Sequence, residues 1–272
     1  MQLAVSNNGS LYYEVINLVP PWQKNPQTIV FSHGVGTNSD IWHAWKPILA
    51  PFFRLVCVDT RGFGRSSRHG ADFAYSFDLW CDDIAEIADA SGAKTFHLVG
   101  EAMSGTVALH LSGTKHRDRL LSLTTCSSPY RGADLPHVSD WKERLNNKGV
   151  AAWSKTMMEQ RFYAGALSEA AYAWFAQEQG KSDAEALLGW GECLLQADLT
   201  ETLKKITVPT LLLAPDNSPY VTVDIANAMR KLIPGADLMV VPNARHGLPF
   251  SHGEECAVAL LDFLDRKGFV SE

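Results

Sequence analysis

The 272-residue sequence has few cysteines, no excess of positive charge and no long hydrophobic run. Its cysteines, Cys57, Cys81, Cys126, Cys193 and Cys256, are scattered without a C-x-x-C pair, which argues against a disulfide framework or a zinc site and predicts buried thiols in a reducing cytoplasm. The net charge of −6 excludes the basic surface typical of nucleic-acid binding. The longest apolar runs, such as VPTLLLAP, are far shorter than the ~20 residues of a membrane span. The N-terminal segment has no basic region followed by a long apolar core, so we expect no secretory signal.

A further absence concerns the segment FHLVGEAMSGTVALHL at residues 96–111, which predicts a strand, a glycine turn and a helix. In the nucleophile-elbow pattern G-x-S-x-G, such a turn carries a nucleophilic serine. Here Gly100 occupies the first glycine position, Ala102 the serine position and Ser104 the second glycine position. The methyl group of Ala102 cannot attack a carbonyl carbon. A frame with Ser104 as the nucleophile would push the serine into the helix, so we interpret Ser104 as a small substitute for glycine.

Apolar runs of strand length alternate along the chain with longer segments of helical period. The runs are hydrophobic on both faces, which is typical of a parallel sheet covered by helices on both sides. The pattern predicts a doubly wound α/β fold, with an antiparallel hairpin formed by the first dozen or so residues at one sheet edge. The predicted strands are 28–34, 54–62, 95–101, 120–128, 209–215 and 236–242, and the predicted core helices are 77–92, 103–113, 223–235 and 254–268.

Residues 130–206 interrupt this alternation, because they contain no convincing strand and are rich in Ala, Trp, Met, Glu and Lys. They predict three or four short helices inserted between two core strands. An insertion of this kind in an open α/β sheet usually covers the carboxyl ends of the strands, where ligands bind. We therefore expect a cap (residues 130–206) over a core made of 1–129 and 207–272.

Two other loops that follow predicted strands carry residues suited to catalysis. The segment HGVG at 33–36 places glycines where backbone N–H groups can turn toward a ligand. The segment VVPNARHG places His246 after the last strand, where a general base can reach the elbow. Because the carboxyl ends of parallel strands share one sheet edge, both loops are expected near Ala102.

The order of these features resembles that of α/β-hydrolase-fold proteins over the whole chain. The segment DTRGFGRSS at 59–67 matches the D-x-x-G-x-G-x-S turn of that family. The loop HGVGTNSDIW, the cap ending in QADLTETLKKITVPTLLLAP and the chain length are most similar to 3-oxoadipate enol-lactonase-like hydrolases and small carboxylesterases. The resemblance implies hydrolysis of a carboxylic ester or lactone by acyl transfer. A serine at position 102 would attack, His246 would relay the proton, and the N–H groups of Val35 and Met103 would hold the oxyanion.

The acid of the catalytic triad is harder to place, because the turn after the strand PTLLLA reads APDNSPYV. Counting from the strand favours Asn217, and counting back from PYV favours Ser218. Asp216 is the only carboxylate in the turn, and a carboxylate is suited to orient an imidazole and stabilise its cation. We therefore predict Asp216 as the acid; Asp224 and Asp198 lie farther from the turn.

Three hypotheses account for Ala102. In the first, a serine was replaced by alanine, which leaves the remaining parts able to hold an uncleaved ester or lactone. In the second, the chain is a natural non-catalytic ligand receptor; in the third, it is a cofactor-free lyase with His246 as the base. No metal or organic cofactor is indicated, no nucleic-acid or membrane partner is expected, and oligomeric state is not encoded in any motif.

The pocket is predicted to lie between the core and apolar side chains of the cap. The residues expected to contact substrate are Gly34, Trp153, Met157, Phe162 and Trp190. Such a pocket favours an uncharged ester or lactone, although Arg161 and Lys155 in the cap are each able to bind an acid group.

Overall fold

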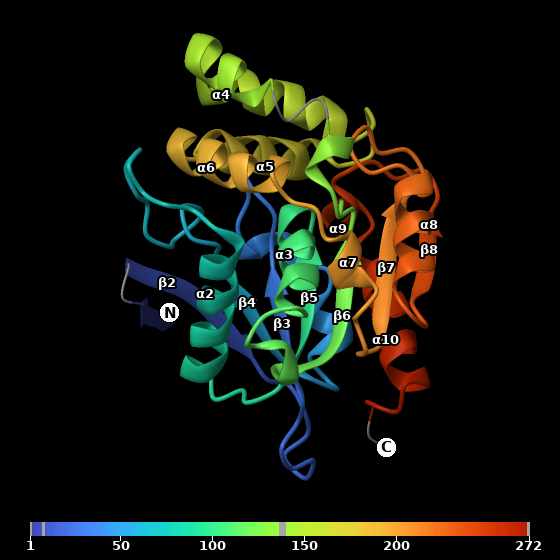
Figure 1. Cartoon of the computed structure of the whole chain (residues 1–272). Helices are drawn as coiled ribbons and strands as arrows, with labels where there is room; N and C mark the ends of the chain where they lie inside the picture. The colour runs from blue at the N-terminus through green and yellow to red at the C-terminus, as the bar shows by residue number, and fades with distance from the viewer. Residues whose placement is uncertain (1, 7–8, 136–139, 271–272) are drawn as a thin grey trace.

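The computed structural model describes residues 2–6, 9–135 and 140–270, and its centre is an eight-stranded sheet with helices on both faces (Figure 1). The strand order is β1-β2-β4-β3-β5-β6-β7-β8, in which β1 and β2 run antiparallel to their neighbours and all other pairs are parallel. The strands are β1 (Gln2–Ser6), β2 (Gly9–Ile16), β3 (Thr28–Ser32), β4 (Arg54–Val58), β5 (Phe96–Glu101), β6 (Leu120–Cys126), β7 (Thr210–Pro215) and β8 (Asp237–Val241). The predicted α/β class, the six core strands and the edge hairpin are confirmed.

Helices cover the two faces of the sheet because each presents an apolar stripe to it. On one face, α2, α3 and α8 bury side chains such as Trp80 and Val107 against the strands. On the other face, α1 and α10 bury Leu49 and Leu260. The core helices are η1 (Ser39–Trp42), α1 (Lys46–Leu49), α2 (Phe77–Ala90), α3 (Met103–Leu111), η2 (Arg117–Arg119), α8 (Val223–Leu232), α9 (Leu248–Ser251) and α10 (Gly253–Arg266). No helix of the described segments is long and apolar enough to span a bilayer.

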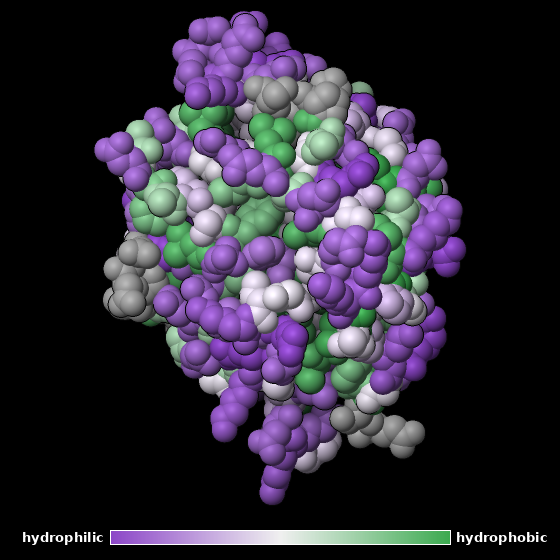
Figure 2. All heavy atoms as spheres, in the orientation of Figure 1, coloured by the Kyte–Doolittle hydropathy of each residue, from purple (hydrophilic) through white to green (hydrophobic). Residues whose placement is uncertain are grey.

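The described part of the segment between β6 and β7 consists of helices joined by loops, and it lies across the carboxyl ends of the strands (Figure 1). Its two ends meet in an antiparallel bridge between Arg131 and Asp198. Figure 2 shows hydrophilic residues over the outer end of α4 and hydrophobic residues below it, along the seam with the core. The helices are η3 (Gly132–Asp134), α4 (Trp141–Arg161), α5 (Glu169–Gly180), α6 (Ala184–Leu195) and α7 (Thr200–Leu203); α7 lies beyond the bridge and contacts α3 and α8.

The turn from β5 into α3 depends on two glycines that let the strand and the helix approach closely. A Cβ atom on Gly100 would lie 2.6 Å from the backbone of Gly105, closer than such atoms approach in proteins. The first glycine of the elbow pattern is therefore required by packing, independently of any chemistry at position 102.

We predict that Gly100→Ala lowers the free energy of unfolding by about 1–3 kcal/mol, because the methyl group forces β5 and α3 apart. Gly180→Ala is the matched control, since a Cβ at Gly180, the last residue of α5, meets no atom within 4 Å. Urea denaturation of both variants measures the difference. Equal destabilisation by the two substitutions would contradict the packing explanation.

Candidate active site at the elbow

Ala102 occupies the apex of the turn between β5 and α3 with φ 52° and ψ −118°. Positive φ is strained for a residue with a side chain, at a cost of roughly 1–3 kcal/mol. The backbone holds it there through hydrogen bonds from Ala102 N to Cys126 O at 2.8 Å and from Gly105 N to Ala102 O at 3.1 Å. The conformation of a nucleophile elbow is therefore present, with a methyl group in place of a nucleophile.

Ser104 does not offer a substitute nucleophile. Its side chain is fully buried, donates to the carbonyl of Ser32 and accepts a 2.9 Å hydrogen bond from Glu101 N. The hydroxyl thus fastens the elbow to β3, and the frame with position 102 at the apex is the one that the chain adopts.

Val35 and Met103 are the two residues whose backbone N–H groups the sequence predicts as donors to an oxyanion. Both residues line the cavity next to Ala102, one in the loop after β3 and the other at the first position of α3. Neither amide hydrogen-bonds to another described residue. The N-terminal amides of a helix have no partner within the helix and carry partial positive charge, so the site favours an oxygen with negative character.

His246 lies beside Ala102 in the cavity wall, but its partner is not the predicted carboxylate. The Oγ of Ser218 is 3.3 Å from His246 Nδ1. The exposed carboxylate of Asp216 instead accepts hydrogen bonds from Asn243 N at 2.9 Å and Ala244 N at 3.0 Å. The structure therefore does not bring Asp216, the predicted acid, to His246: the turn directs its carboxylate to the following loop, and Ser218 is the residue next to Nδ1.

The hydrogen bonds of Ser218 determine which ring nitrogen of His246 carries the proton. Ser218 Oγ accepts from Tyr220 N at 3.2 Å and Val221 N at 3.1 Å, so its hydroxyl hydrogen remains for Nδ1. We therefore assign the ring proton to Nε2, the reverse of a Ser-His-Asp triad, in which Nδ1–H donates to the acid. Burial, and secondarily the charge of Arg161, lower the pKa of His246 well below 6.5. His246 is thus a neutral imidazole that offers a hydrogen-bond donor.

A buried ion pair joins the elbow to the cap. Arg161 Nη1 donates to Glu101 Oε1 at 3.0 Å, and the side chains of both residues are at most 2% exposed. The other oxygen of Glu101 accepts from Gly34 N at 2.6 Å, and Arg161 Nη2 donates to Val35 O at 3.0 Å. The same arginine holds the histidine loop, because Gly247 N donates to Arg161 O at 3.0 Å. Arg161 Nε is buried and has no partner among the described residues.

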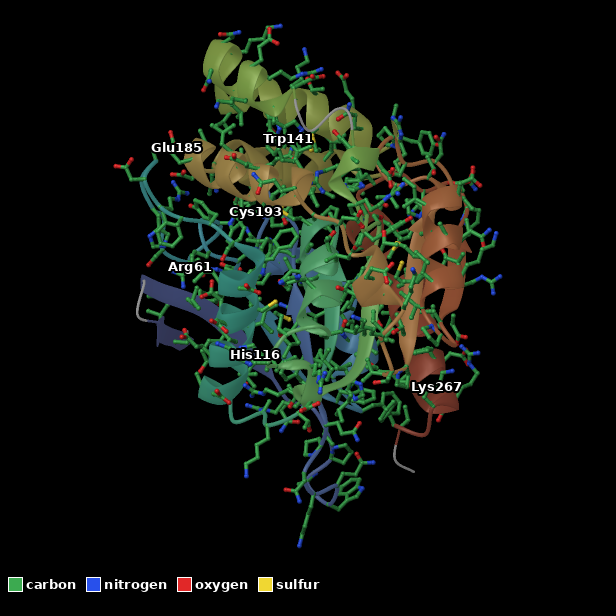
Figure 3. All side chains as sticks on the ribbon, in the orientation of Figure 1. Arg61, His116, Trp141, Glu185, Cys193 and Lys267 are labelled. Carbon is green, nitrogen blue, oxygen red and sulfur yellow. The ribbon has the colours of Figure 1, made fainter. Side chains whose placement is uncertain are left out.

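These groups enclose a cavity of about 30 Å³ between the cap and the core, which is room for about two water molecules. Arg161 Nε, His246 Nε2 and the two backbone amides are hydrogen-bond donors without an acceptor among the described residues. A ligand with several acceptor atoms would therefore complement this wall. Figure 3 shows the lining residue Trp141 between α4 and the helices below it. The lining residues are Val35, Ala102, Met103, Pro129, Leu135, Trp141, Met157, Arg161, Leu194, Tyr220 and His246.

Of the five residues predicted to contact substrate, only Met157 lines this cavity. Trp190 donates from its indole nitrogen to a carbonyl in the loop after β4 and packs against α2. Phe162 packs in an aromatic cluster with α5 and α9, and Trp153 makes an edge-to-face contact within α4. Gly34 binds Glu101. Gly34, Trp153, Phe162 and Trp190 therefore do not line this cavity, and the three aromatic rings pack within the cap or against the core.

Sequence reasoning missed several residues of the site. Trp141, Leu194 and Tyr220 give no signal of their own in the sequence, although Ser218 could have been found by counting back from PYV. Glu101 could have been recognised as a charged residue ending a buried strand, which requires a partner. Arg161 lies in the wall, whereas the other cation considered for an acid group, Lys155, is exposed. In the part of the chain that the structure describes, no cluster of three His, Cys, Asp or Glu side chains could hold a metal ion.

Comparisons with known proteins agree with this fold. Residues 27–253 match the family model described as alpha/beta hydrolase fold. The chain is 29% identical to a putative carbamate hydrolase RutD from a Caulobacter species, over 88% of this chain and 90% of that protein. It is 27% identical to a pimeloyl-[acyl-carrier protein] methyl ester esterase from Yersinia pseudotuberculosis, over 87% and 93% of the two chains. The crystal structure of the enol-lactonase from Burkholderia xenovorans superposes with a TM-score of 0.89 at 22% identity, covering 97% of this chain and 100% of that chain.

We predict that the free energy of unfolding falls as the pH drops below about 6.5 and that His246 contributes to this loss. The unfolded imidazole gains a proton near 6.5 while the folded one does not, which costs up to about 1.4 kcal/mol per pH unit. His246→Gln should therefore show a shallower decline between pH 6.5 and 5 in urea denaturation. His97→Gln is the positive control, because burial lowers the pKa of His97 to about 3. An unchanged slope for His246→Gln would mean that this imidazole titrates normally in the folded protein.

Breaking the Glu101–Arg161 pair should be costly. We expect Arg161→Met alone to lower the free energy of unfolding by about 3–5 kcal/mol, because it leaves a buried carboxylate unpaired. The double variant Glu101→Gln/Arg161→Met should lose less than the sum of the two single changes. Lys204→Met is the control, since the Lys204–Glu201 pair is exposed and is expected to contribute at most about 1 kcal/mol. Additive losses in the double variant would rule out the coupling.

Proposed function

Because the chain belongs to the alpha/beta hydrolase fold family, we propose that its cavity receives a small ester, lactone or carbamate, and that the chain holds this compound without forming an acyl-enzyme. The observation that carries the proposal is the pairing of His246 with Ser218 beside an apex methyl group. The backbone N–H groups of Val35 and Met103 would polarise the carbonyl oxygen of such a compound. The nucleophile and the carboxylate that would make the histidine a strong base are absent from their positions.

The relatives support the substrate class. Their names give a carbamate, a methyl ester and an enol lactone as the compounds cleaved, and each of these contains a carbonyl group next to an oxygen or nitrogen leaving group. A carbonyl oxygen is an acceptor without a donor, which complements a wall of donors. The small closed cavity means that a ligand of this class enters only when the cap and the core separate.

Loss of a serine at position 102 alone does not account for the site, because position 218 also lacks the acid. Two changed positions favour a protein whose pocket has lost acyl transfer over a hydrolase altered at one residue. The alternative of a lyase with His246 as its base receives no support from the geometry, since the Ser218 hydroxyl leaves the imidazole with a donor facing the cavity. The receptor hypothesis fits the chain with Ala102 and Ser218.

Rebuilding the triad tests the proposal. We expect Ala102→Ser alone to hydrolyse p-nitrophenyl acetate and butyrate only weakly, and Ser218→Asp alone to be inactive. The double variant Ala102→Ser/Ser218→Asp should be about 10³- to 10⁴-fold faster than Ala102→Ser, because the carboxylate restores the tautomer and stabilises the imidazolium. Initial rates and labelling by a fluorophosphonate measure both effects, and the unchanged chain should bind unreacted ester in saturation-transfer NMR.

Asp216→Asn in the double variant is the control and should leave the rate within the same order of magnitude. If Ala102→Ser alone matches the double variant and Asp216→Asn abolishes its activity, the protein is a serine hydrolase with Asp216 as its acid. If the unchanged chain binds none of the esters, lactones or carbamates, the proposed substrate class is wrong.

A further inference from the structure

Strand β8 forms an open edge of the sheet. It pairs with β7 on one side and has no strand on the other. Its three central residues, Leu238, Met239 and Val240, are apolar, and none is fully buried. Edge strands of monomeric proteins are usually protected by charged residues, proline or a covering segment, because their free N–H and C=O groups can pair with another strand. The middle of β8 has no such side chain.

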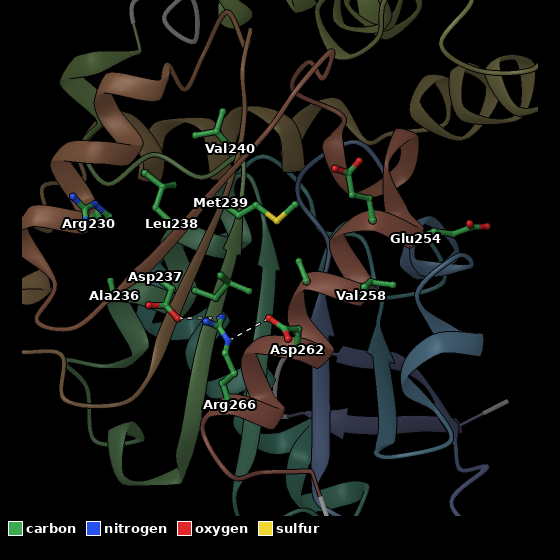
Figure 4. Close-up of a pocket in the computed structure, with 13 residues that line it drawn as sticks. Arg230, Ala236, Asp237, Leu238, Met239, Val240, Glu254, Val258, Asp262 and Arg266 are labelled. Atoms are coloured by element: carbon green, nitrogen blue, oxygen red, sulfur yellow. Dashed lines mark hydrogen bonds and ion pairs between the residues drawn. The ribbon is translucent and has the colours of Figure 1, made fainter.

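A cleft of about 870 Å³ runs along this edge between β8 and α10 (Figure 4). Its wall is largely apolar: Val240 is 38% exposed and Val258 of α10 is 56% exposed. Figure 4 shows the side chains of β8 and those of α10 facing the cleft from its two sides. The cleft therefore combines apolar side chains with backbone N–H and C=O groups that have no strand partner. A second strand could pair with this backbone, and an apolar helix beside that strand could cover the side chains.

Charges are distributed unequally between the two ends of the cleft. Glu254 and Glu255 begin α10 at one end, and neither has an ion-pair partner among the described residues. The other end carries charges of both signs. There Arg266 lies 3.4 Å from Asp237 and 3.2 Å from Asp262, and Lys267 lies 3.8 Å from Asp237. A partner running in the opposite direction would match acids with cations at both ends.

We propose that the β8 edge is a dimer interface on which a second copy of this chain docks. The two β8 strands pair antiparallel about a twofold axis near Met239, so that the two sheets become continuous. The same axis places the two α10 helices side by side in opposite directions and brings Glu254 and Glu255 of each copy near Arg266 and Lys267 of the other. A second copy is the occupant that this surface fits, because a twofold contact uses one self-complementary patch and closes.

Sedimentation equilibrium of the full chain tests the dimer, with an expected mass of twice 29.9 kDa. Val258→Glu should raise the dissociation constant by tenfold or more, because it buries a carboxylate in the apolar strip. Leu18→Glu is the matched control, since Leu18 is 63% exposed outside the cleft; it should leave the dissociation constant unchanged. Circular dichroism and the thermal midpoint confirm that both variants fold.

Charge reversal identifies the arrangement. Glu254→Lys/Glu255→Lys and Arg266→Glu/Lys267→Glu should each weaken the dimer, and the variant that combines all four substitutions should recover most of the association. A monomeric wild-type chain overturns the proposal. So does a dimer that neither Val258→Glu nor charge reversal weakens, because its interface would lie elsewhere. A dimer weakened by each reversal without recovery in the combined variant would overturn the antiparallel arrangement.

Discussion

The buried ion pair between Glu101 and Arg161 is the interaction on which the site depends. Its two side chains connect the elbow, the loop after β3 and the cap through three hydrogen bonds, and the backbone carbonyl of Arg161 accepts a fourth from Gly247 N at 3.0 Å. A buried carboxylate or guanidinium is tolerated only when it is paired and hydrogen-bonded. The end of α4 that carries Arg161 therefore cannot leave the core without leaving the Glu101 carboxylate buried and unpaired. The donor geometry at Val35 is fixed by the same contacts.

The protonation of His246 is decided by burial, by the positive charge of Arg161 and by the group at position 218. A hydroxyl there does not stabilise an imidazolium, whereas a carboxylate would. The neutral histidine and the unpaired Nε of Arg161 then lie in a wall that is otherwise mostly apolar. The chemistry of the pocket follows from Ser218 as much as from Ala102, since each removes one half of a proton relay.

The sequence predicted the parts of the molecule that depend on local pattern. Strands such as β5 were recognisable from continuous hydrophobicity, and Gly100 marked the elbow because only a small residue fits against α3. The sequence left Asp216, Asn217 and Ser218 as alternatives for the residue next to His246, because the path of the turn decides which side chain reaches the imidazole. In the structure, Asp216 N pairs with Val241 O and Asn217 N with Ala244 O, and this backbone pairing directs Asp216 away from the site. Glu101 and Arg161 are far apart in the sequence, so no motif spacing indicates that they form a pair.

The sequence also could not show which cap aromatics line the cavity and which ones pack inside the cap. Large rings in an insertion must first bury themselves, and burying a Trp or Phe against the core stabilises the cap whether or not a ligand is present. The cap residues that do line the cavity are Leu135, Trp141, Met157, Arg161 and Leu194. α4 is interrupted at Gly149, whose φ of 72° and ψ of 175° are not helical, so its first half is not rigidly continuous with the half that carries Arg161. Because the second half is fixed to three loops, enlargement of the cavity for a ligand must come from the side of Trp141.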